Sequence, residues 1–237
     1  TAILRQGAKP VFVDIDADTK NTTAELIEVA LSDKTKVIMP VHYAGNACKM
    51  DDILQLAEAN NLFVIEDAAQ GVGSSYKDKP LGTWGDLGAF SFHETKNITC
   101  GEGGALIINR ESLVQRAEIL WEKGTNRKQF FRGEVDKYSW VDQGSSFLPS
   151  DITAAVLWAQ LQKIEEVTKN RVNIWNQYFQ RFEDLENRGL IQRPRLTSGG
   201  KHNGHIFYLI FNDYEERNRV LDHLKTKQIG ATFHYLP

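Results

Sequence analysis

Residues 91–97 read Ser-Phe-His-Glu-Thr-Lys-Asn and precede a glycine-rich turn, Gly-Glu-Gly-Gly, at 101–104. The apolar run at 87–93 predicts a strand that ends at this polar turn, and the run at 105–109 predicts a second strand after it. Lys96 is therefore delivered to a turn among small polar residues. A lysine is usually solvated, but a desolvated amine loses its proton more easily, and only the neutral amine attacks a carbonyl. Lys96 is thus a candidate covalent catalyst.

A carboxylate ends another apolar run. Residues 62–67, Leu-Phe-Val-Ile-Glu-Asp, predict a buried strand that ends at Asp67. Taken alone, Asp67 is more often a helix N-cap or a surface acid. An acid and a lysine that follow two strands of one sheet are, however, what a pyridoxal phosphate (PLP) site needs. The lysine makes the Schiff base, and the acid keeps the pyridine nitrogen protonated so that the ring can act as an electron sink.

The first 70 residues alternate between strand and helix patterns. Strands are predicted at 9–15, 36–42 and 62–67, and helices at 22–31, with Thr22 or Thr23 as N-cap, and at 50–60. This order predicts parallel strands with right-handed crossovers, and ligands gather at the carboxyl ends of such strands. His42 falls at one such end, although a lone histidine there is more often structural.

The rest of the chain predicts a bridge to a second, smaller domain. A helix at 111–123 precedes an aperiodic loop at 124–144 that is rich in arginine, lysine and aromatic residues, which suits either a phosphate-bearing ligand, a solvated loop or a subunit contact. We predict a PLP-binding large domain at 1–150, a long bridging helix at 151–190 capped by Asp151, and part of a small α+β domain at 191–237. The small domain should contain strands at 206–211 and 231–235 and a helix at 214–227.

Composition narrows the class of protein. The net charge of −3 gives no general attraction to nucleic acid or to anionic membranes. The two cysteines, Cys48 and Cys100, form no CxxC motif and no metal-ligand spacing, so no metal site is predicted, and they favour a reducing, cytoplasmic location. No signal peptide and no run of about 18 apolar residues is present, so we expect no membrane association. Residues 1–7 look like the end of a helix closed by Gly7, and we expect the sequence to be a piece of a longer protein.

Three segments together resemble the DegT/DnrJ/EryC1 family of sugar aminotransferases. They are the strand end Glu66-Asp67-Ala68-Ala69-Gln70, the lysine stretch at 91–97 and the Gly-Glu-Gly-Gly turn at 101–104, and the resemblance runs through nearly the whole chain. It implies the fold-type I architecture of PLP-dependent transferases: an α/β fold with a largely parallel central sheet and helices on both faces. It also implies a homodimer with shared active sites.

The resemblance implies a role for each matching residue. Lys96 would carry the cofactor and shuttle the proton, Asp67 would pair with the pyridinium nitrogen, and Gln70 would hydrogen-bond the phenolic oxygen. Ser91 would bind the phosphate, and His93 lies in the same motif. Ser146 stands where the family usually has an asparagine that reaches the partner subunit's cofactor phosphate. The family's phosphate-binding loop and stacking aromatic would both lie before Thr1.

The loop at 123–138 resembles that of family members which act on dTDP-linked sugars, and this implies contacts to substrate. Lys137, Arg132 and Tyr235 are the candidate residues. The implied reaction is PLP-dependent transamination of a dTDP-linked 4-keto-6-deoxy sugar, with L-glutamate as amino donor, giving a 4-amino-4,6-dideoxy sugar for surface polysaccharide synthesis.

Two alternatives remain open at this level. The chain could be a non-catalytic fragment that binds a nucleotide sugar or assists assembly through the loop at 124–144. It could also be an NAD-dependent sugar enzyme, although no GxGxxG opens a helix anywhere in the sequence.

Overall fold

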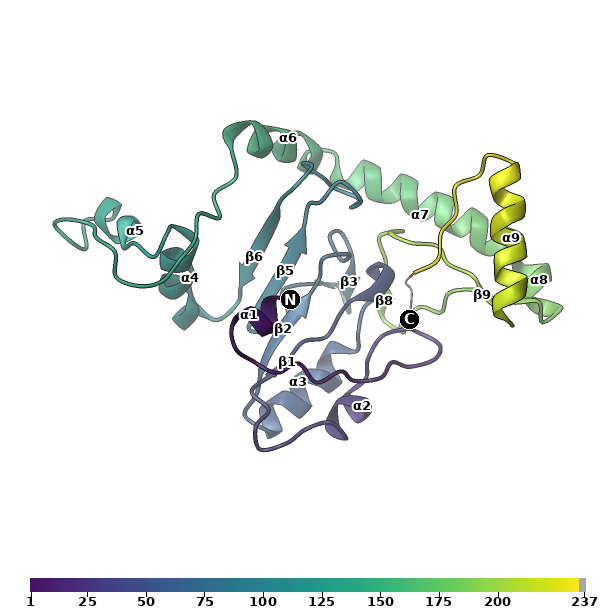
Figure 1. The fold of residues 1–237 in the computed structure, drawn as a ribbon, viewed down its shortest axis with the longest axis horizontal. Coiled ribbons are helices and arrows are strands. Elements are labelled where there is room, and N and C mark those ends of the chain that lie inside the picture. The colour runs from purple at the N-terminus through teal and green to yellow at the C-terminus, as the bar shows by residue number, and fades with distance from the viewer. Residues whose placement is uncertain (235–237) are drawn as a thin grey trace.

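The computed structural model describes residues 1–234 and is built on a four-stranded mixed sheet (Figure 1). The sheet order is β1-β2-β5-β6. Its strands are β1 (Val37–Ile38), β2 (Phe63–Asp67), β5 (Leu87–Ser91) and β6 (Gly104–Ile108). β1, β2 and β5 are parallel, and β6 runs antiparallel to β5. The predicted α/β fold with a largely parallel sheet is confirmed.

Two small sheets and a set of helices complete the chain. The small sheets join β3 (Ser75–Tyr76) to β4 (Lys79–Pro80) and β8 (Gly200–Lys201), and β7 (Ile191–Gln192) to β9 (Ile210–Phe211). The helices are α1 (Ala2–Arg5), α2 (Ala24–Glu28), η1 (Tyr43–Gly45), α3 (Met50–Ala59), η2 (Glu111–Leu113), α4 (Val114–Trp121), α5 (Arg127–Phe131), α6 (Asp151–Leu161), α7 (Ile164–Arg181), α8 (Glu183–Asn187) and α9 (Tyr214–Thr226). None of the helices in residues 1–234 is long and apolar enough to cross a lipid bilayer.

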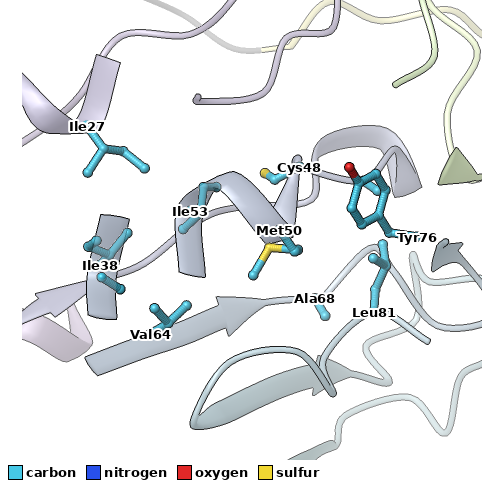
Figure 2. Packing of buried hydrophobic residues seen from close by; sticks show 11 residues of the cluster. Ile27, Ile38, Cys48, Met50, Ile53, Val64, Ala68, Tyr76 and Leu81 are labelled. Atoms are coloured by element: carbon cyan, nitrogen blue, oxygen red, sulfur yellow. The ribbon is translucent and has the colours of Figure 1, made fainter. Parts of the chain in front are cut away.

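The hydrophobic core lies between the sheet and α3 (Figure 2). Met50, Ile53 and Ala57 recur at helical spacing and are 0–2% exposed, so they form one apolar face of α3. This face packs on Ile38 and Val64 of the sheet. Complete burial of each large side chain contributes roughly 1.5–3 kcal/mol to folding. The core therefore fixes α3 on one face of the sheet.

Alternation along the strands sends other side chains to the opposite face. Val64 is buried, whereas its neighbour Phe63 is 39% exposed, and Leu106 of β6 is 52% exposed. The register pairs Asp67 with Ala89, and because parallel partners point the same way, Asp67 and Ser91 share a face. In the described residues this face keeps exposed apolar side chains.

The carboxylate of Glu66 is the polar centre of the core. It is fully buried and accepts four hydrogen bonds, from His42 Nε2 at 2.9 Å and from the backbone N–H groups of Gly82, Trp84 and Gly85 at 2.8, 2.6 and 2.8 Å. Burial raises the pKa of this carboxyl, but the hydrogen bonds from His42 and from the glycines outweigh burial and hold the pKa below its ordinary value. Glu66 therefore stays ionised and joins β2 to the turn before β5.

Several predicted elements differ from the structure. Residues 9–15 form no strand, and Phe12 is 92% exposed, because no described strand pairs with them. Ser150, not Asp151, caps α6, since its Oγ accepts a hydrogen bond from the Thr153 N–H at 3.2 Å. The strand predicted at 206–211 shortens to β9, and residues 231–234 form no strand; position 235 lies outside the described residues.

Other boundaries agree with the sequence. Thr23 caps α2, although this helix ends at Glu28 and not at position 31. The helix predicted at 50–60 is α3, and Asp213 caps α9, which covers nearly all of the helix predicted at 214–227. The long bridging helix is broken into α6, α7 and α8.

The segment after α8 is held on α7 by one aromatic side chain. Trp175 is 5% exposed, and its Nε1 donates to the Ile206 carbonyl at 3.0 Å. Its ring lies 4.4 Å from the His202 ring and 5.3 Å from the Phe207 ring, measured between centroids. α7 thereby holds residues 202–207.

We expect Glu66→Gln to lower the free energy of unfolding by about 3 kcal/mol. The amide NH₂ of glutamine would face backbone N–H donors in place of an acceptor oxygen, and a buried donor would lose its partner. Urea unfolding followed by circular dichroism measures the loss. Glu58→Gln, the same change at an exposed position of α3, is the matched control. Equal unfolding free energies for the two variants would contradict the role given to Glu66.

Candidate active site

Asp67 lies at the carboxyl end of β2, on the sheet face opposite α3. One of its oxygens, Oδ1, accepts a hydrogen bond from the Ala69 N–H at 3.1 Å. Among the described residues the other oxygen, Oδ2, has no hydrogen-bond partner. Asp67 therefore offers a free carboxylate oxygen to a cationic N–H group at this strand end.

Ser91 and Lys96 follow from the neighbouring strand β5. Ser91 ends β5 on the same face as Asp67, and its Oγ accepts a long hydrogen bond of 3.4 Å from the His93 N–H, so its own proton is free to donate. The turn closes when the Lys96 N–H donates to the His93 carbonyl at 2.9 Å. Within residues 1–234, the Lys96 ammonium forms no ion pair and no hydrogen bond. An unpaired lysine thus stands beyond the strand end.

Gln70 is held in the loop that follows β2. Its Oε1 accepts a hydrogen bond from the Ala44 N–H at 2.5 Å. Because the oxygen is used in this way, the amide NH₂ group is the part of Gln70 that can donate to a ligand. Its backbone carbonyl accepts from Asn203 Nδ2 at 2.7 Å. The loop is thus fixed both by its side chain and by its backbone.

His93 is half-exposed and interacts locally. Its Nδ1 lies 2.9 Å from Thr95 Oγ1, and its Nε2 lies 3.6 Å from Glu102 Oε1 in the glycine-rich turn. These contacts brace the lysine turn, and they leave the ring at the edge of the site.

The side chain of His42 does not join that of Asp67, contrary to the grouping suggested by the strand ends, although the His42 N–H donates to the Asp67 carbonyl at 3.1 Å. Its Nδ1 accepts a hydrogen bond from the Cys48 N–H at 3.1 Å, so its Nε2 carries the proton and donates to Glu66. Both ring nitrogens are therefore used inside the core. The histidine is structural because alternation sends Glu66 to the face opposite Asp67.

The remaining predicted site residues lie on a segment that projects from the sheet, the arm at 122–150 (Figure 1). Ser146 is exposed and forms a single antiparallel bridge with Glu122 beside α4. Lys137 is exposed in the same arm. The structure does not bring these side chains to the strand ends that carry Asp67 and Ser91. Tyr235 lies outside the described residues.

Arg132 is paired with one acid of α4 and one acid of the arm. Its Nη1 donates to both carboxylate oxygens of Glu118 at 2.9 Å, and its Nε donates to Glu134 at 2.5 Å. These hydrogen bonds, that of Glu134 first, raise the pKa of the guanidinium above its ordinary value. In this arrangement the Arg132 guanidinium joins the arm to α4.

Three residues in or beside the lysine turn receive no role from the sequence patterns. Asn97 Oδ1 lies 2.9 Å from His205 Nδ1, and Asn97 Nδ2 donates to the Asn203 carbonyl at 3.0 Å. In the sequence, Asn203 ends what reads as a polar connection at 192–203, and His205 follows it without a motif of its own. No pattern in a single sequence signals a contact across more than 100 residues.

A cavity lies away from these residues, at the segment after α8. It has a volume of about 310 Å³, and its lining includes Lys20, Glu186, Arg193 and Arg195. Arg193 and Arg195 both pair with Glu186, and Lys20 donates to the Ala17 carbonyl. The cations of this cavity are therefore already paired with an acid or hydrogen-bonded, and neither Asp67, Ser91 nor Lys96 lines it.

Known proteins resemble this chain along its whole length. The model of the DegT/DnrJ/EryC1/StrS aminotransferase family matches residues 1–237. An uncharacterized protein of Methanocaldococcus jannaschii is 41% identical over 99% of the chain, and the spore coat polysaccharide biosynthesis protein SpsC of Bacillus subtilis is 34% identical over 99%. The chain spans 62% and 61% of the lengths of these two relatives.

A solved structure shares the fold. The putative sugar aminotransferase Spr1654 of Streptococcus pneumoniae, in its PMP form, superposes with a TM-score of 0.88 at 28% identity. The match covers 100% of this chain and 63% of that one.

We expect the His205 ring to titrate near pH 4 and to be neutral at pH 7. Burial above all, together with the nearby charge of Lys96, lowers the pKa of His205 to about 4. Between about pH 6.5 and 4 the unfolded chain would bind a proton that the native state does not, so stability should fall as the pH falls through this window. Histidine NMR titration, assigned with His205→Gln, measures the value; a midpoint near 6.5 would contradict it.

Proposed function

Since the chain belongs to the DegT/DnrJ/EryC1/StrS aminotransferase family, we propose that the protein which contains it transfers an amino group to a keto sugar, with PLP as cofactor. The observation that carries this proposal is the free oxygen of Asp67 and the unpaired amine of Lys96 beyond neighbouring parallel strands. The PMP form of the Streptococcus pneumoniae relative supports the same cofactor.

The residues present fit this cofactor. Asp67 Oδ2 would accept a hydrogen bond from the pyridinium N–H, the Gln70 amide would donate to the phenolic oxygen, and the Ser91 hydroxyl would donate to the phosphate. His93 would remain at the edge of the phosphate site. When bound, PLP supplies an electron sink that stabilises negative charge on the reacting carbon.

Lys96 is the group that moves the proton in this proposal. It would hold the cofactor at rest and then, as a free neutral amine, take a proton at Nζ from the amino donor and return one to the sugar carbon. A single group acts as base and acid best when its pKa lies near the working pH. Asp67 would keep its negative charge throughout, because it only stabilises the cationic ring nitrogen.

We propose a dTDP-linked 4-keto-6-deoxy sugar, dTDP-4-keto-6-deoxyglucose, as acceptor and L-glutamate as donor. The product would be a 4-amino-4,6-dideoxy sugar for surface polysaccharide, and the polysaccharide role of the Bacillus subtilis relative supports this class. The exposed cation Lys137 on the arm supports a diphosphate contact.

A homodimer is part of the proposal. The arm and the following helix α6 expose Trp140, Phe147, Ile152 and Trp158 at 65–80%, which is costly for a monomer in water. A partner subunit would cover this surface, and Ser146, Arg132 and Lys137 of the arm would then lie near the partner's site.

We expect borohydride reduction of the whole protein loaded with PLP to remove its visible absorbance band and to leave the label on Lys96. Peptide mass spectrometry locates the label. Lys96→Arg should give neither band nor turnover. The guanidinium keeps the positive charge of lysine, but it stays protonated and so cannot attack a carbonyl. Lys49→Arg, at an exposed position before α3, should behave as wild type. A label on another lysine would remove Lys96 from this role.

We expect Lys137→Ala to raise the KM for the dTDP sugar about tenfold and to leave kcat within about twofold. Loss of one charge-assisted hydrogen bond to a phosphate costs about 1.4 kcal/mol of binding, and a contact made equally in ground and transition states changes KM alone. Initial rates with dTDP-4-keto-6-deoxyglucose and glutamate measure both constants, and 2-oxoglutarate reports the donor. An unchanged KM would place the diphosphate elsewhere.

A further inference from the structure

The side chain of Asn203 forms a buried junction between distant segments. It is 1% exposed, and its Nδ2 donates to the carbonyls of Gln70 and Val72 at 2.7 and 2.8 Å. Its Oδ1 accepts from the His205 N–H at 3.0 Å. Every polar group of this amide is therefore used, and the loop after β2 is tied to the segment held by α7.

Gly45 leaves room for this junction. Its φ is +76°, and a Cβ at this position would lie 2.1 Å from Asn203 Oδ1. A side chain here would displace the amide from its bonds. The backbone of η1 thus shapes the space that Asn203 occupies.

Asn97 extends the junction to the lysine turn. Its Nδ2 donates to the Asn203 carbonyl, so its Oδ1 is the atom that faces His205 Nδ1. Because Oδ1 can only accept, His205 must carry its proton on Nδ1. The residue that directly follows Lys96 is thereby held by two hydrogen bonds to the segment at 203–205.

We propose that Asn97, Asn203 and His205 are positioning residues for Lys96. Together they fix the lysine turn against the loop that follows Asp67 and carries Gln70. This inference rests on the proposed function. The turn itself is polar and partly exposed, and its internal hydrogen bonds are short-range. Pairing of β5 with β2 places the start of the turn, and the contacts to 203–205 tie its far side to the loop after β2. Misplacement of a reacting group by about 1 Å can cost a hundredfold in rate.

Asn203→Ala compared with Asn109→Ala tests the inference in the whole protein. Asn109 is a matched control because its Nδ2 also donates to two carbonyls, those of Gly82 and Gly85 at 3.2 and 2.8 Å, but it follows β6 at the other end of that strand from the lysine turn. Hydrogen exchange is read at the Lys96 and Cys100 amides, which donate to His93 and Phe92 carbonyls within the turn.

The two variants should differ. In Asn203→Ala we expect exchange at these amides to accelerate at least about tenfold, and kcat to fall about a hundredfold while KM for the sugar changes less than about threefold. In Asn109→Ala both should stay near wild type. Equal exchange at Lys96 and equal kcat in the two variants would overturn the proposal.

Substitution of His205 supplies a second test, which decides the matter if Asn203→Ala fails to fold. His205→Asn places an amide donor near the position of Nδ1 and should restore protection of the turn, whereas His205→Gln places it near Nε2 and should not. Matching exchange rates in the two variants would contradict the positioning role of Asn97, Asn203 and His205. The borohydride label on the wild-type protein distinguishes failure of the proposed function from failure of the positioning role. If Lys96 is not labelled, the proposed function fails. If Lys96 is labelled but the variants agree, only the positioning role fails.

Discussion

The buried carboxylate of Glu66 is the constraint on which the arrangement depends. A charge without water must have all its hydrogen-bonding positions filled, and here they are filled by His42 and by the backbone of the turn at 82–85. These bonds fix where β5 begins relative to β2 and where the chain leaves β1. The alternation of a strand then places the next residue, Asp67, on the opposite face, so a buried structural acid and an available acid are neighbours in sequence.

The same alternation places the apolar core and the candidate site residues on opposite faces of the sheet. One face packs Met50, Ile53 and Val64 into a dry core, and the other carries Asp67 and Ser91 at the ends of parallel strands. The stiffness of the core face supports the reactive face, because Asp67 cannot move without moving Glu66. The lysine turn is flanked by the buried side chains of Phe92 and Ile98, and Asn97 ties it in addition to the later segment at 203–205.

Much of this could be predicted from the sequence. The apolar runs at 62–67 and 87–93 locate β2 and β5, and the spacing at 50–60 locates α3, because these elements bury side chains within their own periodic pattern. The run at 9–15 has a strand pattern but no strand, since pairing requires a neighbour that a pattern cannot supply. Strand ends share an edge of the sheet, so the pattern groups His42 with Asp67. The two side chains point to opposite faces, which the strand-end pattern does not show. The arm at 122–150 has no periodic spacing of apolar residues, so the sequence pattern does not predict where it lies.

The anchor of the lysine turn also sets the order in which the site can form during synthesis. Asn203 meets Gln70 across 133 residues, and Asn97 meets Asn203 across 106. A ribosome that adds about 5–20 residues per second needs roughly 5–20 s to travel from the lysine to its anchor. For that interval the nascent chain holds β2 and β5 without the contact that fixes Lys96. Long-range closure of this kind is slow in folding as well, so the reactive turn is among the last parts of the chain to acquire its final form.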